Sequence, residues 1–283
     1  MTYLEDLFSK SEQKMTETTK NGYIGILYRL NEKKPVTSLK FLNDYEHIFK
    51  LMEGKADNTI KTSITPILKA LALTGKSESK LYKTYKKRFD EIWEKNRKLN
   101  DSNEKTEKQV DNWASAQDVM KMLEDLIEKE PNSDKTMILA LYVLNAPRRN
   151  LDYMNMHVVA EYYPDEHDDK DANYFDMVNK KFIFNNYKTR KVYGKQVIPV
   201  DDKLYKIILD NLKERPREIL IDNKNDNYIT KVLNKVFYPK KIGCTMLRHI
   251  YLSDKYASGI EEKKKDSLEM GHSISTQADY IKL

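Results

Sequence analysis

The sequence predicts a mainly α-helical protein with a small antiparallel β-sheet, divided into two parts. Apolar residues recur at helical spacing through residues 1–100 and again through much of residues 114–283. Segments rich in aromatic and β-branched residues, which favour strands, occur only between residues 157 and 200. The stretch 100–112 has one apolar residue in thirteen. We therefore expect a linker at residues 101–113, between a helical part and a mixed α+β part.

The first part is expected to contain four helices, each with one apolar face. They are predicted at residues 16–31, 38–52, 58–73 and 77–98. Pro35 separates the first two, because proline breaks a helix, and Gly54 ends the second. Gly75 stops the third helix, and Ser77 is expected to cap the fourth.

A ridge of lysines is predicted along the fourth helix. Its members are spaced four, three and four residues apart: Lys76, Lys80, Lys83 and Lys87. Residues 1–105 contain 21 Lys and Arg against 15 Asp and Glu, whereas residues 106–283 contain 29 of each. The lysine ridge and the positive charge of residues 1–105 suit contact with a phosphate backbone. The alternative interpretation is an ordinary solvent-exposed helix face, which has the same composition.

The second part is expected to begin with two helices and to end with three, on either side of the sheet. The helices are predicted at residues 115–128, 133–144, 201–213, 228–237 and from 244 to a stop at Gly259, and the strands at 157–163, 182–187 and 196–200. Pro147 fixes a turn after the second helix, and a short helix follows it. The buried face of the last helix is expected to contain Leu247, Ile250, Tyr251 and Leu252. Arg248 then lies beside the core, where an arginine needs an anion.

Composition excludes several classes of protein. A single cysteine, Cys244, rules out an internal disulfide and fits a reducing compartment. One cysteine and five scattered histidines do not build a zinc site, and the acidic loop 164–171 reads as a solvated turn, so no metal is expected. No apolar run approaches the ~18 residues of a membrane span, and the N-terminus lacks an apolar signal segment. We therefore expect an intracellular protein.

The connection between the last two predicted strands is strongly basic. Residues 180–195 contain six Lys and Arg and no Asp or Glu, with Gly194 at the expected turn. A hairpin of this kind suits insertion into a groove of a nucleic acid or against its phosphates.

Four segments occur in the order and at the intervals of a known family. They are Ala-Pro-Arg-Arg-Asn-Leu-Asp at 146–152, Tyr-Lys-Thr-Arg-Lys at 187–191, Met-Leu-Arg-His-Ile-Tyr at 246–251, and Met-Gly-His-Ser-Ile-Ser-Thr-Gln-Ala-Asp-Tyr at 270–280. The pattern resembles the tyrosine recombinases (the phage-integrase family), in particular the integrases of large DNA viruses and transposons. It covers about residues 115–283, the family's catalytic domain. Residues 1–100 match the family's helical core-binding domain, which clamps DNA, in size and class only.

The resemblance implies a role for each matching residue. Tyr280 takes the nucleophile position and would attack a backbone phosphate, giving a 3′-phosphotyrosyl link and a free 5′-hydroxyl. Arg248 and His272 match the residues that donate to the phosphate oxygens. Lys188 matches the hairpin lysine that protonates the leaving 5′-oxygen. The family uses no metal or other cofactor, so protein cations must offset the charge at phosphorus.

The first catalytic arginine has two candidates. An arginine followed three residues later by an acid, as in the family, is found at Arg149 and Asp152, and the alternative is Arg148. The nearest rivals of Lys188 are Lys191 and Lys195. The residues expected to bind DNA without taking part in catalysis are Arg148, Thr245, Lys76, Lys80, Lys83, Lys87, Arg190 and Lys191.

One position departs from the family pattern. Thr245 stands three residues before Arg248, where the family usually has His or Lys. Threonine can hydrogen-bond a phosphate but is a poor base. His249, which follows the arginine, is expected to be structural.

The sequence thus leads us to expect a site-specific DNA recombinase or integrase from a mobile genetic element. Its expected partners are double-stranded DNA and, on DNA, three further copies of itself in a homotetramer. It is expected to act where the DNA is, in the nucleus or cytoplasm of a host or in a virion. The alternatives are a type IB topoisomerase, which relaxes supercoils by the same chemistry, and a DNA-binding relative that has lost catalysis, which Thr245 favours.

Overall fold

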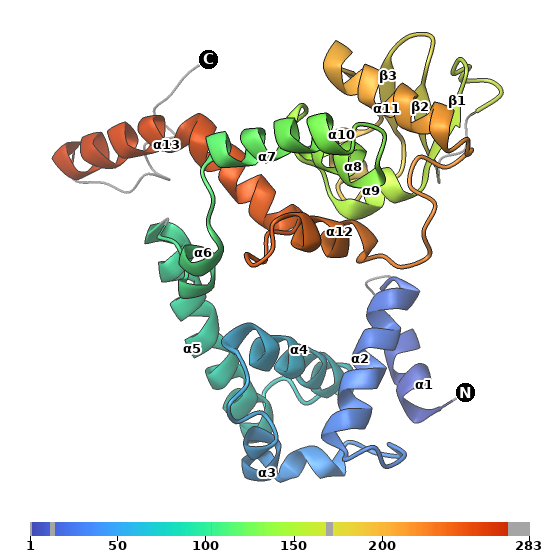
Figure 1. Cartoon of the computed structure of the whole chain (residues 1–283). Helices are drawn as coiled ribbons and strands as arrows, with labels where there is room; N and C mark the ends of the chain where they lie inside the picture. Colours follow the sequence, from blue (N-terminus) through green and yellow to red (C-terminus); the bar gives the residue numbers. More distant parts are fainter. Residues whose placement is uncertain (1, 12–14, 103, 168–171, 271–283) are drawn as a thin grey trace. The chain divides into compact units, whose positions relative to one another are not determined.

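The protein is described by a computed structural model that covers residues 2–11, 15–102, 104–167 and 172–270 (Figure 1). The chain forms two compact units, Met1–Glu104 and Lys105–Leu283. Each unit has a hydrophobic core of its own. The second unit begins at Lys105, and the stretch 101–113, for which a linker is expected, contains the helix α6 (Glu107–Asn112).

All regular elements among the described residues of the first unit are helices. Its elements are α1 (Tyr3–Ser9), α2 (Glu17–Leu30), the 3-10 helix η1 (Lys40–Asn43), α3 (Tyr45–Lys50), α4 (Asp57–Leu73) and α5 (Lys80–Ser102). The helices α4 and α5 pack along each other. Tyr85 on α5 is fully buried, and its hydroxyl donates a hydrogen bond to the carbonyl oxygen of Leu42 at 2.9 Å. This bond ties α5 to the end of η1.

Local capping explains where this unit differs from the prediction. The predicted helix at 38–52 is divided into η1 and α3, because the Asp44 side chain accepts a hydrogen bond from the backbone of His47 at 3.1 Å and starts a new helix. No helix is predicted at α1, which begins with a capping box between Thr2 and Glu5. At seven residues, α1 is too short for helical periodicity to show in the sequence.

The lysine ridge lies only partly on α5. The helix begins at Lys80 rather than near Ser77, because the Ser79 hydroxyl accepts a hydrogen bond from the backbone of Tyr82 at 3.1 Å. Lys76 therefore precedes the helix. All four members of the ridge are exposed: Lys76, Lys80, Lys83 and Lys87.

The second unit packs helices around one buried helix, α8. Its elements are α6 (Glu107–Asn112), α7 (Ala116–Lys129), α8 (Asp134–Val143), α9 (Asn150–Met154), β1 (Met156–Val159), β2 (Asn173–Asp176), β3 (Lys181–Phe184), α10 (Arg190–Tyr193), β4 (Gln196–Pro199), α11 (Asp202–Glu214), α12 (Tyr228–Val236) and α13 (Cys244–Met270). Every residue from Thr136 to Tyr142 of α8 is buried, and α7, α11 and α12 pack against this helix (Figure 1). The protein is therefore mainly α-helical with one small sheet, as predicted.

The sheet has four strands in the order β1-β2-β3-β4 and is mixed. The pair β3–β4 forms the predicted antiparallel hairpin, and the pair β2–β3 is antiparallel as well. The pair β1–β2 is parallel, with Met156 opposite Asn173, and β2 itself is not predicted from the sequence. A strand of four residues, all buried, has no polar alternation to reveal it.

The last helix, α13, continues past Gly259, where the sequence predicts its end. A glycine inside a helix costs about 1 kcal/mol relative to alanine. The residues that follow, Glu261 to Lys265, are strong helix formers and offset this cost. Leu247 and Ile250 are buried as predicted, but Leu252 is 49% exposed. None of the described helices, α13 included, is long and apolar enough to span a membrane.

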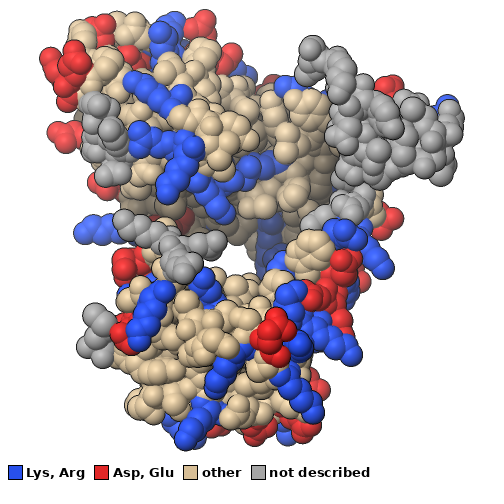
Figure 2. Space-filling model, turned by 180° about the vertical axis from the view of Figure 1, so that it is seen from behind, with Lys and Arg blue, Asp and Glu red and all other residues tan. Residues whose placement is uncertain are grey.

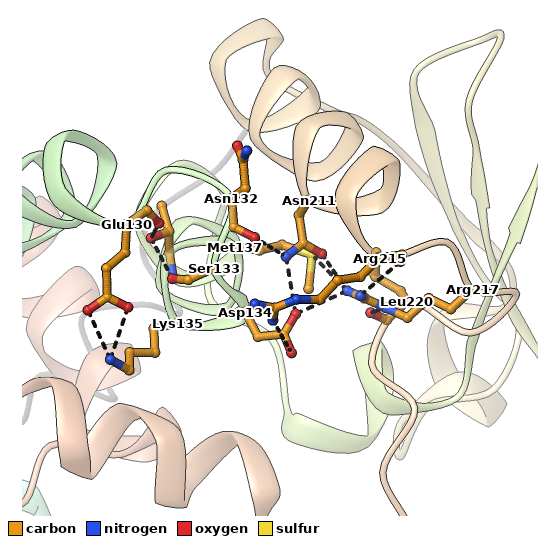
Figure 3. Close-up of polar contacts among 11 residues, drawn as sticks. Glu130, Asn132, Ser133, Asp134, Lys135, Met137, Asn211, Arg215, Arg217 and Leu220 are labelled. Atoms are coloured by element: carbon orange, nitrogen blue, oxygen red, sulfur yellow. Dashed lines mark hydrogen bonds and ion pairs between the residues drawn. The ribbon is translucent and has the colours of Figure 1, made fainter.

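A polar network joins the start of α8 to the end of α11 (Figure 3). The carboxylate of Asp134 pairs with Arg215 at 3.2 Å and with Arg217 at 3.4 Å. The Arg217 guanidinium also donates to the Asn211 side chain at 2.5 Å and to the carbonyl oxygen of Leu220 at 2.9 Å. Asn211 is fully buried. The network fixes the segment after α11 against α8, on the scaffold that carries the site described next.

Candidate active site

A cavity of about 700 Å³ in the second unit is lined by residues from separate parts of the sequence. The segments involved are the start of α9, the connection after β3, the start of α12 and the start of α13. The predicted site residues on its walls are Arg149, Lys188, Thr245 and Arg248. The predicted catalytic residues His272 and Tyr280 lie outside the described residues.

Two arginines supply the positive charge of the cavity. Arg149 is the residue at which α9 begins, and Arg248 lies on α13; both side chains are half-buried. Neither guanidinium makes a hydrogen bond or ion pair with another residue that the structure describes. A half-buried guanidinium without a carboxylate partner is available to an anion, and its planar fork suits the oxygens of a phosphate.

Arg148, next in the chain to Arg149, has a different environment. Its Nε donates to a carboxylate oxygen of Asp152 at 3.0 Å, and Nη1 donates to the Gln196 side chain at 2.8 Å. The guanidinium also lies 3.7 Å from the ring centroid of Phe184. Its side chain is 14% exposed and that of Asp152 is 5% exposed. Protein partners thus occupy the Arg148 guanidinium, and the acid of the arginine motif holds Arg148 rather than Arg149.

A buried asparagine holds the connection after β3 at the cavity. The Asn173 side-chain oxygen accepts hydrogen bonds from the backbone of Asn185 at 2.9 Å and of Asn186 at 2.7 Å. Its amide group donates to the carbonyl oxygen of Asp152 at 2.9 Å. Asn173 is 1% exposed. It therefore links α9 to the segment that carries Lys188, a role that no pattern in the sequence indicates.

The structure separates Lys188 from its two rivals. Lys188 lines the cavity, whereas Lys191 and Lys195 are not among the residues that form its walls. The Lys195 ammonium lies 4.5 Å from the ring centroid of Tyr162 and donates to the hydroxyl of Tyr162 at 3.1 Å. Lys191 is exposed on α10. Of these three lysines, Lys188 is the one that lines the cavity.

The start of α13 packs closely on α9 and α12. The Cys244 thiol donates to the carbonyl oxygen of Arg148 at 3.3 Å, and burial raises the pKa of this thiol, which keeps it protonated as a donor. Thr230 on α12 accepts a hydrogen bond from the Asn150 side chain at 3.0 Å. A Cβ atom at Gly243 would lie 2.8 Å from Cγ2 of Thr230. Position 243 therefore has no room for a side chain.

Gly243→Ala is expected to lower the free energy of unfolding by about 1–3 kcal/mol, because the added methyl group overlaps the stiff Thr230 side chain. The displacement of Thr230 also disturbs Asn150 on the cavity wall. The matched control is Gly259→Ala, inside α13, where an added Cβ meets no atom within 4 Å. The control is expected to raise the free energy of unfolding, measured with urea, by about 0.5–1 kcal/mol. Equal effects of the two variants would contradict the close packing at Gly243.

A smaller cavity of about 320 Å³ adjoins the first. The two share Thr230, Cys244 and Thr245, and the smaller one adds the basic residues Lys108, Lys241 and His249. His249, for which a structural role is expected, is exposed here. Lys108 lies on α6, which is held to the second unit by a 2.6 Å hydrogen bond from the backbone of Lys241 to the Asn112 side chain. Positive charge thus continues beyond the first cavity.

The described residues offer no metal site. No group of three or more His, Cys, Asp or Glu side chains suited to a metal ion occurs in that part of the chain. On the face of the second unit seen in Figure 2, Lys and Arg side chains lie near the middle and most Asp and Glu side chains toward the rim.

The chain was compared with family models, curated proteins and solved structures. No family model matches the sequence, and no curated protein matches it. The fold is similar to the crystal structure of XerA recombinase, with a TM-score of 0.38, 12% sequence identity, and coverage of 99% of this chain and 93% of that chain. At this level of similarity, the functional conclusion depends on the residues of the cavity.

Proposed function

We propose that this protein is a DNA strand transferase of the tyrosine-recombinase type, which cleaves and rejoins DNA through a 3′-phosphotyrosyl intermediate. The observation that carries the proposal is the convergence of Arg149, Lys188 and Arg248 on one cavity from three separate segments. Two guanidinium groups without carboxylate partners and one lysine supply the positive charge that a phosphodiester needs.

In the proposed reaction, the hydroxyl oxygen of Tyr280 gives up its proton to water, attacks a backbone phosphorus and forms the new P–O bond. The bond from phosphorus to the 5′-oxygen breaks, and Lys188 supplies the proton that this oxygen takes up. Arg149, Arg248 and His272 donate to the non-bridging oxygens, where charge accumulates. Attack by the 5′-hydroxyl reverses these steps and releases the tyrosine, so rejoining needs no ATP and no cofactor.

The first unit is proposed to grip the duplex as a helical clamp. The exposed lysines Lys80, Lys83 and Lys87 on α5, with Lys76 before it, provide contacts for phosphates. Arg190 and Lys191 on α10 and Thr245 on α13 are proposed as further DNA contacts. Site-specific recombination or integration for a mobile element, by a homotetramer on two DNA sites, is the form of the activity that we propose.

A DNA-binding relative without catalysis is the second candidate, because Thr245 on the cavity wall is a poor base. A covalent adduct on a nicked suicide duplex separates the two, since strand loss after cleavage traps the protein on DNA. We expect the full chain to form this adduct and Tyr280→Phe to form none. The matched control is Tyr256→Phe, at a tyrosine that is 49% exposed on α13, and it is expected to react normally.

Two outcomes of this experiment would overturn the proposed chemistry: no adduct with the full chain, or an adduct with Tyr280→Phe. Relaxation of a supercoiled plasmid by the same preparation tests the topoisomerase alternative. Turnover on plasmids of unrelated sequence would favour that enzyme over a site-specific recombinase.

A further inference from the structure

Two large apolar side chains stand exposed at the tip of the basic connection between β3 and β4. Val192 is 75% exposed and Tyr193 is 65% exposed, and both lie on the short helix α10. Single exposed apolar residues are common on protein surfaces. Two adjacent ones on one short helix indicate a surface that is covered when a partner binds.

The charge around the tip identifies the kind of partner. The connection, residues 185–195, contains four Lys and Arg and no Asp or Glu. Cores of protein–protein interfaces are depleted in lysine, whereas DNA interfaces are strongly positive. The same connection supplies Tyr187 and Lys188 to the cavity proposed to hold a DNA phosphate. A polyanion with apolar faces, such as the stacked bases of a duplex, fits both the cations and the apolar pair.

The tip is held in shape before any partner arrives. The Tyr187 hydroxyl donates to the carbonyl oxygen of Gly194 at 2.7 Å, and the backbone of Val192 and of Tyr193 donates to the carbonyl oxygen of Thr189 at 3.0 and 3.2 Å. Gly194 has φ +66°, a conformation that glycine adopts readily, and it turns the chain back toward β4. A tip that is already ordered loses little entropy when it inserts into a partner.

We propose that Val192 and Tyr193 form a wedge that enters the duplex between two adjacent base pairs near the phosphate held in the cavity. Apolar side chains that insert at a base step unstack it and bend the duplex, and an aromatic ring can stack on the exposed base. The neighbouring cation Lys191 is exposed on α10 and is suited to contact the backbone beside the wedge. The inference rests on the proposed DNA-binding function, and it adds a residue pair that senses how easily a base step opens.

The wedge is tested by comparing two 30-base-pair duplexes of the same sequence, one fully paired and one with a single central T·T mismatch. Pairing and stacking are already weakened at a mismatch, so inserting the wedge there costs less free energy than inserting it between two paired steps. We expect the full chain to bind the mismatched duplex about tenfold more tightly, measured by fluorescence anisotropy. The double variant Val192→Ser, Tyr193→Ser is expected to bind both duplexes equally.

The matched control changes the same two residue types at exposed positions elsewhere in the second unit. Val178 is 65% exposed and Tyr238 is 83% exposed, so Val178→Ser, Tyr238→Ser removes similar apolar surface. This control is expected to keep the mismatch preference and, like the wedge variant, the thermal midpoint of the full chain. If the full chain binds both duplexes equally, or the wedge variant keeps the preference, the wedge is wrong while DNA binding stands. If the full chain binds neither duplex, the proposed function fails together with the wedge.

Discussion

Replacing Arg248 by glutamine is expected to slow formation of the covalent protein–DNA adduct about a thousandfold. The Arg248 guanidinium is half-buried on the cavity wall and pairs with no described carboxylate, so it is available to the phosphate. Charge gathers on the phosphate oxygens in the transition state, and the neutral amide of glutamine offsets little of it. The rate is measured as the single-turnover appearance of adduct on the nicked suicide duplex.

Two further variants make this result specific. Arg248→Lys is expected to recover little activity, because an ammonium group cannot bridge two oxygens as the planar guanidinium does. Arg215→Gln, at an arginine of the second unit that pairs with Asp134 at 3.2 Å, is the matched control and should cleave at the normal rate. Cleavage by Arg248→Gln at the rate of the unaltered chain would remove Arg248 from the site.

Arg148→Gln and Arg149→Gln are expected to fail in different ways. Arg148→Gln leaves the carboxylate of Asp152, which is 5% exposed, without its ion-pair partner. The loss of one member of a buried pair lowers the free energy of unfolding by about 3–5 kcal/mol. Arg149 has no described partner to lose, so Arg149→Gln should change stability by less than about 0.5 kcal/mol. It should nevertheless slow cleavage about a hundredfold to a thousandfold, because it removes a donor to the phosphate.

The loss of stability in Arg148→Gln is measured by urea unfolding of the full chain, from the unfolding transition of the second unit. The slower cleavage by Arg149→Gln is measured as the rate of adduct formation. The double variant Arg148→Met, Asp152→Asn removes both buried charges. It should regain much of the stability that Arg148→Gln loses, since no unpaired carboxylate remains. If Arg149→Gln destabilises the protein and Arg148→Gln does not, the roles assigned to the two arginines are reversed.

The helices that the sequence predicts best are those with a cap and a long apolar face. The serines Ser115 and Ser133 begin α7 and α8, and each side chain accepts a hydrogen bond from the backbone three residues later. The Thr16 side chain caps the start of α2 in the same way. Such bonds join residues within one helical turn, so the local sequence contains all of their partners. The short elements α1 and β2 escape prediction because they have too few residues to show a period.

The residue types of the candidate site also follow from the sequence, but the separate role of each residue does not. The motif offers Arg148 and Arg149 with equal charge, and only the fold shows which one is already engaged. Arg148 bonds to Gln196, 48 positions away in the chain, and lies on the ring of Phe184. The sequence by itself determined the helical class, the long capped helices α2, α7 and α8, and the list of candidate cations. The tertiary structure decided which cations share a cavity, that Asn173 links α9 to the Lys188 segment, and that the Val192–Tyr193 tip is exposed. These depend on contacts between distant segments, which local hydrogen bonds and apolar periodicity do not specify.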